Sequence, residues 1–273
     1  MKKIWAHALV KNEERYIWFA VMSVIDWVDK ILIWDTGSND KTLRIVKEIQ
    51  KIKANKVIFR QCGEINKFEF PQLRQKMLEE TKSDWVLTLD GDEIWWEDSI
   101  RKLTKLLSYK DTRWESIVVK TVNCVGDIYH FQGDEGARYE FLRKKGHFNL
   151  RAFSTKIPGL HAEGEHGRQG YFDEKGVPIQ DRNGRVWLLP VSYLHMTHLT
   201  RSSSRNLDKN VMKRSAKIKY ELGISFPLDF YYPEVFFKPK PLSVPSPWIK
   251  LSGFGLMKSY LETPLKYIKR KVL

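Results

Sequence analysis

The chain has 273 residues, of which 42% are hydrophobic and 29% are charged, and its formal net charge is +14. This composition is typical of a globular protein with a substantial core, and it excludes a disordered chain. The only two cysteines, Cys62 and Cys124, form no C-x-x-C motif, which argues against a disulfide framework or a zinc ribbon and favours a reducing, cytoplasmic setting.

The first residues contain no long apolar run, so we do not expect a signal peptide. No stretch of the sequence approaches the roughly 18 apolar residues of a membrane-spanning helix. We therefore expect a soluble protein, or one that lies peripherally on the inner face of the membrane.

The first half of the sequence alternates between strands and helices. Strands are predicted at residues 4–10, 31–34, 57–59 and 85–89. Helices are predicted from Glu13, with Asn12 as the cap, then over 41–51 and 71–80. This order predicts a Rossmann-like, mostly parallel α/β sheet flanked by helices.

The second half is less regular. Strands are predicted at 117–122 and 186–194, and a helix over 206–222. Six of the eleven prolines lie between Pro227 and Pro247, which predicts an extended, irregular segment there. We expect a catalytic domain over residues 1–200 and a basic, helical and proline-rich extension over 201–273.

The extension is strongly basic, with fifteen Lys and Arg against five Asp and Glu. Such asymmetry suggests an anionic partner, although a solvated lysine-rich surface is the simpler interpretation. Within it, Trp248 and Phe254 lie among lysines, as in an interfacial helix on anionic lipid. A helix that packs on the catalytic domain has the same composition, and the sequence leaves both alternatives open.

An acidic cluster, Asp90-Gly91-Asp92-Glu93, follows the apolar strand at residues 85–89. Carboxylates are costly to bury, so we expect them in the crevice beyond the strand's carboxyl end, where open α/β sheets bind ligands. Asp90 and Asp92 can approach one divalent cation, which in turn holds phosphate oxygens. The alternative is that the cluster caps a following helix.

Three blocks together carry a resemblance to a known family. They are Val10 to Glu14, Asp35 to Thr42, and Asp84 to Glu93, each placed where a predicted strand ends. In order and separation they resemble the family 2 glycosyltransferases of GT-A fold, over roughly residues 3 to 110. The resemblance implies a metal-dependent, inverting transfer of a sugar from a nucleotide diphosphate to a hydroxyl.

The resemblance also implies roles for individual residues. Asp92 would bind the metal directly, with Asp90 nearer the ribose or reaching the metal through water, and Asp35 would hydrogen-bond the base. The loop Val10, Asn12 and Glu13 would line the nucleotide pocket together with Gly91. A turn-forming aspartate explains Asp35 equally simply, and helix capping explains Asn12.

The strand predicted at 186–194 is followed by His195 and His198. Enzymes of this fold often take a further metal ligand from a histidine late in the catalytic domain. Imidazole and carboxylate ligands suit Mn²⁺, and carboxylates suit Mg²⁺. One of the two histidines is expected to bind, with His195 slightly favoured because it directly ends the apolar run; a packed core histidine is the alternative.

The acceptor hydroxyl needs a general base. Glu163 and Glu165, in the glycine-rich loop 159–167, are the candidates, although they depart from the usual acidic pair of the family. The loop 133–136 is the fallback, and a solvated turn is the simple alternative for both. Arg143 and Arg151 could clamp phosphate, but isolated arginines more often lie on the surface.

Rival functions are a nucleotidyltransferase and a protein that binds nucleic acid. The first strand lacks the glycine-rich triphosphate loop of the former, and the acidic cluster would repel nucleic acid unless a metal intervened. The sequence therefore favours a glycosyltransferase with a divalent cation and a nucleotide-sugar donor, UDP being the commonest carrier. The acceptor would be a glycan or lipid-linked hydroxyl, with an anionic membrane surface as a further partner and no nucleic acid expected.

Overall fold

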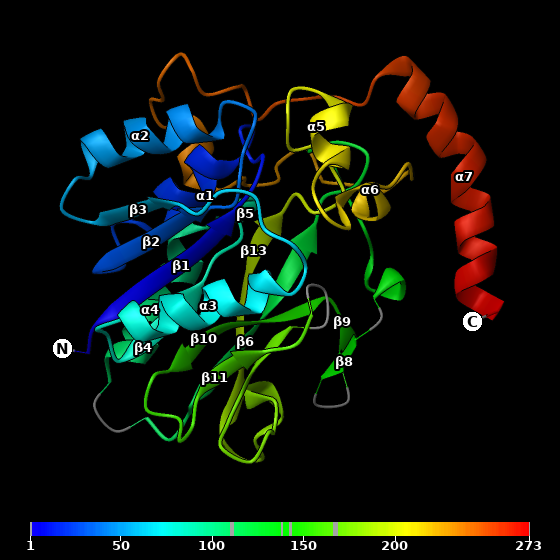
Figure 1. Cartoon of the computed structure of the whole chain (residues 1–273). Coiled ribbons are helices and arrows are strands. Elements are labelled where there is room, and N and C mark those ends of the chain that lie inside the picture. Colours follow the sequence, from blue (N-terminus) through cyan, green and yellow to red (C-terminus); the bar gives the residue numbers. More distant parts are fainter. Residues whose placement is uncertain (1, 110–111, 138, 142–143, 166–168, 273) are drawn as a thin grey trace.

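The computed structural model describes residues 2–109, 112–137, 139–141, 144–165 and 169–272. Within these residues, eight strands form one sheet in the order β3-β2-β1-β4-β10-β6-β13-β5 (Figure 1). The strands are β1 (Ile4–Val10), β2 (Lys30–Asp35), β3 (Val57–Gln61), β4 (Trp85–Thr88), β5 (Glu93–Trp95), β6 (Ser116–Asn123), β10 (Phe148–Ser154) and β13 (Val186–His195). Of these eight, β5 and β10 run against the common direction of the others.

The helices alternate with the first strands, as predicted. They are α1 (Ile17–Val24), α2 (Thr42–Ile52), α3 (Glu69–Glu80), α4 (Glu97–Ser108), α5 (Arg205–Lys209), α6 (Arg214–Lys217) and α7 (Gly253–Val272). Short strand pairs lie outside the sheet: β7 (His130–Phe131) with β14 (Ile224–Ser225), β8 (Tyr139–Phe141) with β9 (Lys144–Gly146), and β11 (His161–Glu163) with β12 (Gly170–Phe172). The predicted fold class, a mostly parallel α/β sheet flanked by helices, is confirmed.

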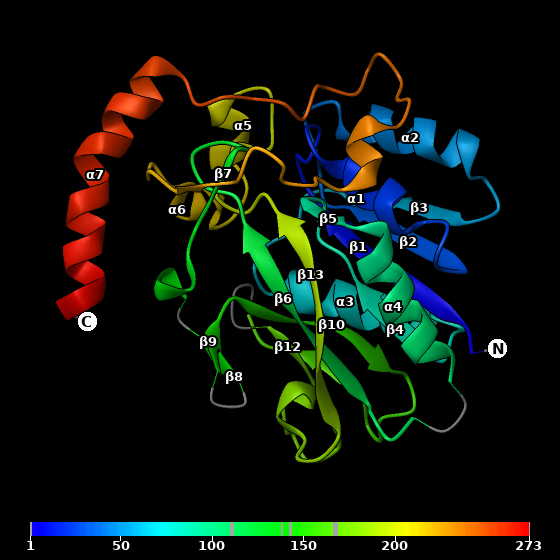
Figure 2. The ribbon, with the colours of Figure 1, turned by 180° about the vertical axis from the view of Figure 1, so that it is seen from behind.

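The two faces of the sheet are buried by different helices, with α3 on one face and α4 on the other (Figures 1 and 2). Because successive side chains of a strand point to opposite faces, Ala8 and Val10 of β1 pack in the cluster that contains α1, α2 and α4. Leu9 of the same strand packs with Met77 of α3. Burial on both faces explains why these strands read as continuous apolar runs.

Two predicted helices differ from the structure. Helix α1 begins at Ile17 rather than Glu13, because Asn12 has a φ of 53° and its side chain bonds other loops instead of capping the helix. The helix predicted over 206–222 is reduced to α5 and α6, with Lys213 between them at a φ of 60°. The residues that follow the two interruptions, Glu13 and Arg214, form a buried ion pair with each other.

The C-terminal part of the chain crosses the molecule before it ends in α7. Trp248 precedes this helix and packs against Tyr232 and Phe236, so it belongs to the aromatic core and not to an interfacial helix. Helix α7 itself stands along one side of the molecule, away from the sheet, in both views (Figures 1 and 2). None of the helices in the described ranges combines the length and apolar character needed to cross a membrane.

Candidate functional site

The carboxyl ends of β1, β2 and β4 lie side by side. Val10 is in register with Asp35 across β1 and β2, and His7 is in register with Thr88 across β1 and β4. The three acidic or polar blocks that follow these strands therefore meet at one edge of the sheet, where open α/β sheets bind ligands.

The loop after β1 is fixed by its polar side chains. The Asn12 amide oxygen accepts a hydrogen bond from the backbone N–H of Asn39 at 2.8 Å, and its nitrogen donates to the Leu207 carbonyl at 3.1 Å. The backbone N–H of Glu13 donates to the Thr42 hydroxyl at 2.7 Å. Asn12 thus ties the loop to two distant segments.

Asp35, at the end of β2, forms a tight turn. One carboxylate oxygen accepts hydrogen bonds from the backbone N–H groups of Gly37 at 3.0 Å and Ser38 at 2.9 Å, and the other accepts from the Ser38 hydroxyl. Gly37 has a φ of 87°, which side chains other than glycine rarely adopt. These contacts suit the turn-forming alternative, and the base-binding role of Asp35 stays a prediction.

The loop after β4 packs directly on the loop after β1. A Cβ atom placed on Gly91 would lie 2.7 Å from the Glu13 Cγ, so only glycine fits between the two acidic segments. Asp90 is partly exposed, whereas Asp92 and Glu93 are fully buried. In this acidic cluster, therefore, only the Asp90 carboxylate is accessible to solvent, and those of Asp92 and Glu93 are buried.

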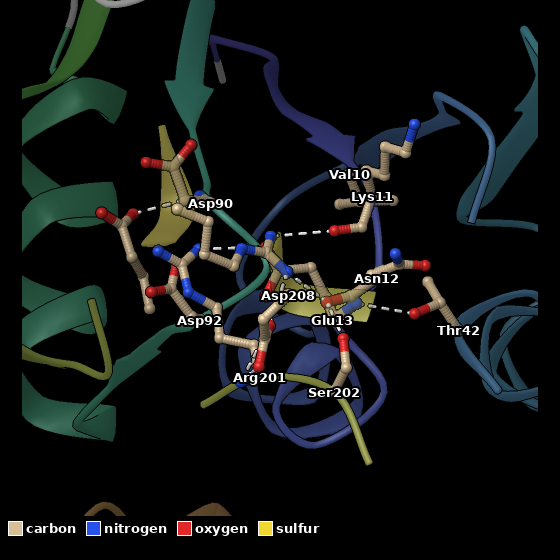
Figure 3. A network of polar contacts seen from close by, with 12 residues as sticks. Val10, Lys11, Asn12, Glu13, Thr42, Asp90, Asp92, Arg201, Ser202 and Asp208 are labelled. Carbon is tan, nitrogen blue, oxygen red and sulfur yellow. Dashed lines mark hydrogen bonds and ion pairs between the residues drawn. The ribbon is translucent and has the colours of Figure 1, made fainter. Parts of the chain in front are cut away.

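Two arginines from the C-terminal extension pair with the buried carboxylates, and Figure 3 shows one of them, Arg201, in the cluster. The Arg201 guanidinium lies 3.0 Å from the Glu13 carboxylate and 3.1 Å from the Asp92 carboxylate. Arg214 also pairs with Glu13, and it lies 3.3 Å from the buried Asp208. Because a buried charge is costly unless it is paired, residues 201–214 are part of this site. The predicted boundary at residue 200 stays a prediction.

The surroundings of Asp92 favour its ionised form. Burial opposes ionisation, but the Arg201 guanidinium and the nearby His195 side chain outweigh that effect and hold the pKa of the carboxyl below its usual range. The His195 Nε2 lies 3.4 Å from Asp92. Neither Asp92 oxygen has a hydrogen bond of good geometry, so both keep lone pairs directed into the cluster.

Asp90, Glu93 and His195 form a second group. One ligand atom from each lies within 4.8 Å of the others. Burial raises the pKa of Glu93 to about 7 despite the Arg151 guanidinium 2.7 Å away. Two carboxylates and an imidazole are a donor set that suits a divalent cation such as Mn²⁺. Of the predicted metal ligands, the structure brings together Asp90 and His195, with Asp92 beside His195.

His198 points elsewhere. Its Nδ1 bonds the Lys217 carbonyl at 2.8 Å, and its Nε2 lies 3.1 Å from the Lys219 ammonium. Burial and the Lys219 charge lower its pKa to about 2. Both ring nitrogens are engaged by these contacts, so His195 is the better candidate of the two.

A cavity of about 190 Å³ opens at this edge of the sheet. Its lining residues come from the strand ends, from α3 and from the extension: Leu9, Val10, Lys11, Glu13, Thr36, Ile65, Phe70, Arg74, Asp90, Gly91, Gln169, Arg201, Asn210, Val211, Met212, Arg214 and Lys217. The cavity therefore offers an accessible carboxylate, several cationic groups and an apolar wall.

Glu163 and Glu165 line a different hollow, between α3 and β11, together with Phe68 and Gln75. Glu163 is well exposed, and Glu165 lies 3.1 Å from the Lys67 ammonium. Residues 166–168 of the same loop lie outside the described residues, as does Arg143. The role of these two glutamates as the base stays a prediction.

Sequence reasoning missed the arginines. The sequence suggests a phosphate clamp or a surface position for Arg151, whereas this side chain is buried and pairs with Glu93. Arg201 and Arg214 belong to no recognisable sequence motif. Arg74, also missed, lies 3.8 Å from Asp90. The available signal was indirect: each carboxylate buried at the strand ends requires a cationic partner.

Comparisons with known proteins identify a matching family. The family described as "Glycosyl transferase family 2" matches residues 9–173. A protein of Rickettsia bellii (strain RML369-C), described as an uncharacterized glycosyltransferase, is 34% identical over 94 residues, which are 34% of this chain and 28% of that protein. The chain therefore matches less than a third of that relative's length.

Several solved structures are similar in part. S. aureus TarS is 15% identical with a TM-score of 0.46, over 72% of this chain and 37% of that one. The mannosyltransferase PcManGT of Pyrobaculum calidifontis, in complex with GDP-Man and Mn²⁺, is 14% identical with a TM-score of 0.44, over 72% and 57%. Glucosyl-3-phosphoglycerate synthase of Mycobacterium tuberculosis, in complex with Mn²⁺ and UDP-glucose, is 17% identical with a TM-score of 0.42, over 71% of each chain.

Proposed function

The chain belongs to glycosyl transferase family 2, and from this premise we propose that it transfers a sugar from a nucleotide diphosphate to an acceptor hydroxyl with inversion. The observation that carries the proposal is the cavity at the ends of β1, β2 and β4. There Asp90 and Gly91 face Val10, Lys11 and Glu13 from the first block. Family 2 membership and this juxtaposition of its blocks support the same site.

The donor would occupy this cavity. Phe70 and Leu9 provide an apolar wall for the nucleoside, and Asn12 and Asp35 hold the two loops that shape it. Lys11 and Arg74 would attract the diphosphate, while Arg201 and Arg214 are already paired with buried carboxylates. Lys11 and Arg74 are paired only with the exposed Glu64 and the partly exposed Asp90, so these two cations, with Lys217 of the same lining, are more available to phosphate than the two buried arginine pairs are.

The residues around Asp90 fit a divalent cation. Asp90, Glu93 and His195 present two carboxylates and an imidazole within 4.8 Å, and the buried Asp92 oxygens have unused lone pairs. These residues, with Asp90 as the accessible member, would hold Mn²⁺ or Mg²⁺. When bound, the cation would neutralise charge that develops on the diphosphate leaving group.

The acceptor hydroxyl, on a glycan or on a lipid-linked molecule, must lose its proton. Glu163 or Glu165 is the proposed base, carried by the loop that leads to Gln169 at the cavity wall. Replacing the correct glutamate by glutamine should lower kcat by about 10²–10⁴-fold and leave nucleotide affinity unchanged. Unchanged kcat in both single variants and in the double variant would exclude these residues.

Calorimetric titration tests the donor site directly. UDP, GDP, CDP and dTDP are titrated into the folded protein with Mn²⁺ and again with EDTA. We expect one nucleotide to bind and EDTA to weaken that binding by at least tenfold. Failure of all four to bind would contradict the proposal, and release of pyrophosphate from a nucleoside triphosphate would indicate a nucleotidyltransferase instead.

A further inference from the structure

Helix α7 packs against the rest of the protein through its polar side. Ser259 is fully buried, and the Thr263 hydroxyl accepts a hydrogen bond from the Leu222 N–H at 2.8 Å. The Arg270 guanidinium donates to both oxygens of Glu221, at 2.6 and 2.8 Å. Spacings of four and seven residues place these three side chains on one stripe of the helix. This stripe is the docked face of α7.

The opposite side of α7 is apolar and exposed. A second stripe has the helical spacing of three and four residues and consists of Phe254, Met257, Leu261, Leu265 and Ile268. Their exposed fractions range from 56% to 68%. Tyr260 and Tyr267 lie beside this stripe and are more than half exposed. The helix is therefore inverted: its polar face contacts the protein and its apolar face contacts the solvent.

Burying an apolar stripe is the usual source of a helix's stability, so this arrangement leaves a large favourable contribution unused. Contiguous exposed apolar patches of this kind mark interaction sites. Figures 1 and 2 show no other described helix or strand over the outer side of α7, which agrees with the exposure of the apolar stripe.

The charges around the apolar face favour anionic lipid as its partner. Lys269 lies four residues after Leu265, borders the apolar stripe and is exposed, whereas the Lys258 ammonium lies over the Tyr220 ring and pairs with Glu262. An anionic membrane surface attracts Lys269 and accepts the apolar side chains below the headgroups.

A basic cavity of about 800 Å³ lies between α7 and the rest of the protein. Its described lining includes five cationic side chains, Lys145, Lys219, Lys266, Lys269 and Arg270, and two anionic ones, Glu135 and Glu262. This cavity shares Ala216 and Lys219 with the neighbouring cavity that His195 lines. Phosphate headgroups at the level of α7 would therefore face a cationic surface continuous with the candidate site.

We infer that α7 docks the enzyme on an anionic membrane, with the helix in the interfacial plane and the stripe from Phe254 to Ile268 inserted among the lipids. Where the proposed transferase function also holds, a lipid-linked acceptor would meet the enzyme from the side of α7. The docking itself rests only on the exposed face and its charges.

The experiment is co-sedimentation of the full chain with vesicles of phosphatidylcholine, alone or mixed equally with phosphatidylglycerol. We expect the mixed vesicles to bind the protein at least tenfold more tightly than the neutral ones. Replacing Phe254, Leu261 and Leu265 together by glutamine should reduce that binding at least tenfold. Lys269→Glu should reduce it about fivefold or more, since a lysine near an anionic surface contributes about 1 kcal/mol.

The matched control replaces three exposed apolar residues outside α7, Ile52, Leu228 and Leu242, by glutamine. This variant should bind vesicles as the unmodified protein does. Absence of binding to the mixed vesicles, or equal binding by the α7 variant, would overturn the inference. A concentration-dependent dimer in sedimentation velocity that the α7 variant abolishes would identify a second copy as the partner instead.

Nucleotide binding by the same α7 variant separates this inference from the proposed function. The three substituted side chains lie outside the nucleotide cavity, so nucleotide affinity should be unchanged. If the unmodified protein binds vesicles but no nucleotide, the docking inference stands and the transferase proposal fails. If it binds nucleotide but no vesicle, the reverse holds.

Discussion

Two regions of this chain break the usual pattern of burial in opposite ways. At the carboxyl ends of β1 and β4, acidic groups are buried: Glu13, Asp92 and Glu93 are almost inaccessible to solvent. In α7, large apolar groups are exposed while a polar stripe is buried. Both arrangements oppose the ordinary driving forces of folding, so each requires a partner.

The difference lies in where the partner is found. The buried carboxylates have theirs inside the protein, because Arg201, Arg214 and Arg151 lie within ion-pairing distance. The apolar face of α7 has no such partner among the described residues. The buried carboxylates are therefore paired within the protein, whereas the apolar face of α7 can be covered only by a partner outside the described residues.

The largest predicted effect comes from breaking the internal pairing. Arg201→Leu leaves Glu13 and Asp92 buried with less positive charge, which should lower the free energy of unfolding by about 3–5 kcal/mol. Denaturant unfolding followed by circular dichroism measures this change. Arg101→Leu is the control, because Arg101 pairs with Asp98 on the surface and should change stability little.

An unfolding free energy that is the same in Arg201→Leu and in the unmodified protein would mean that the buried cluster is neutralised in another way, for example by protonation of Glu13. Asp92→Ala is also expected to destabilise the fold, since it leaves Arg201 without one of its two partners. For this reason Asp92 is a poor choice for a variant intended to test chemistry alone.

These arginines mark the limit of what the sequence could predict. The strands from β1 to β4 were predictable because apolar runs and their spacing are local signals. The partners of Glu13 lie 188 and 201 residues further along the chain, and their position depends on how the extension folds back. The prediction of one helix over 206–222 was wrong for the same reason. Lys213 adopts a left-handed conformation that interrupts the helix, and Arg214 next to it forms ion pairs that the local sequence pattern does not reveal.

The next effect concerns another buried titratable group near the site. His7 of β1 is fully buried, and burial together with the Arg74 charge lowers its pKa from 6.5 to about 3. The unfolded chain therefore binds a proton more readily, so stability is present above pH 6.5 and is lost as the pH falls below it. At pH 5 the loss from His7 should be about 2 kcal/mol.

The measurement is the unfolding free energy at pH 7 and pH 5 for the unmodified protein and for His7→Gln. The variant should lose about 2 kcal/mol less between the two pH values. His198 remains in both proteins, so its own contribution cancels in the comparison. Equal losses in the two proteins would show that His7 does not titrate in this range.

A smaller effect distinguishes the accessible carboxylate from the buried ones. Asp90 is partly exposed and lies 3.8 Å from both Arg74 and Arg151, so Asp90→Asn should change the free energy of unfolding little. Under the proposed function, it should weaken Mn²⁺-dependent nucleotide binding at least tenfold, or about 1.4 kcal/mol. Calorimetric titration of the folded variant gives both the affinity and its dependence on EDTA.

Nucleotide affinity that is unchanged in Asp90→Asn would remove Asp90 from the donor site. Asp84→Asn serves as the control. Asp84 precedes the amino end of β4, far from the candidate site at the carboxyl end, and its carboxylate accepts a hydrogen bond from the backbone N–H of Lys3. That variant should bind nucleotide normally.

The smallest predicted effect is in α7 and concerns stability. Leu261→Ala should change the free energy of unfolding by no more than about 0.5 kcal/mol, because Leu261 is 68% exposed. Leu103→Ala, in α4, removes the same atoms from a fully buried position and should cost about 2–5 kcal/mol. Thermal and denaturant unfolding of the two variants in the absence of lipid measures the contrast.

A large loss of stability in Leu261→Ala would mean that the outer face of α7 is covered when the protein is free in solution, and the docking inference would then lose its basis. A negligible loss of stability in Leu261→Ala would mean that the outer face of α7 is uncovered in the free protein. The apolar stripe would then contribute almost nothing to folding, although glutamine or lysine at the same positions would maintain the helix equally well. An apolar face that folding does not use is best explained by a partner outside the chain, and the exposed Lys269 that borders it favours an anionic surface as that partner.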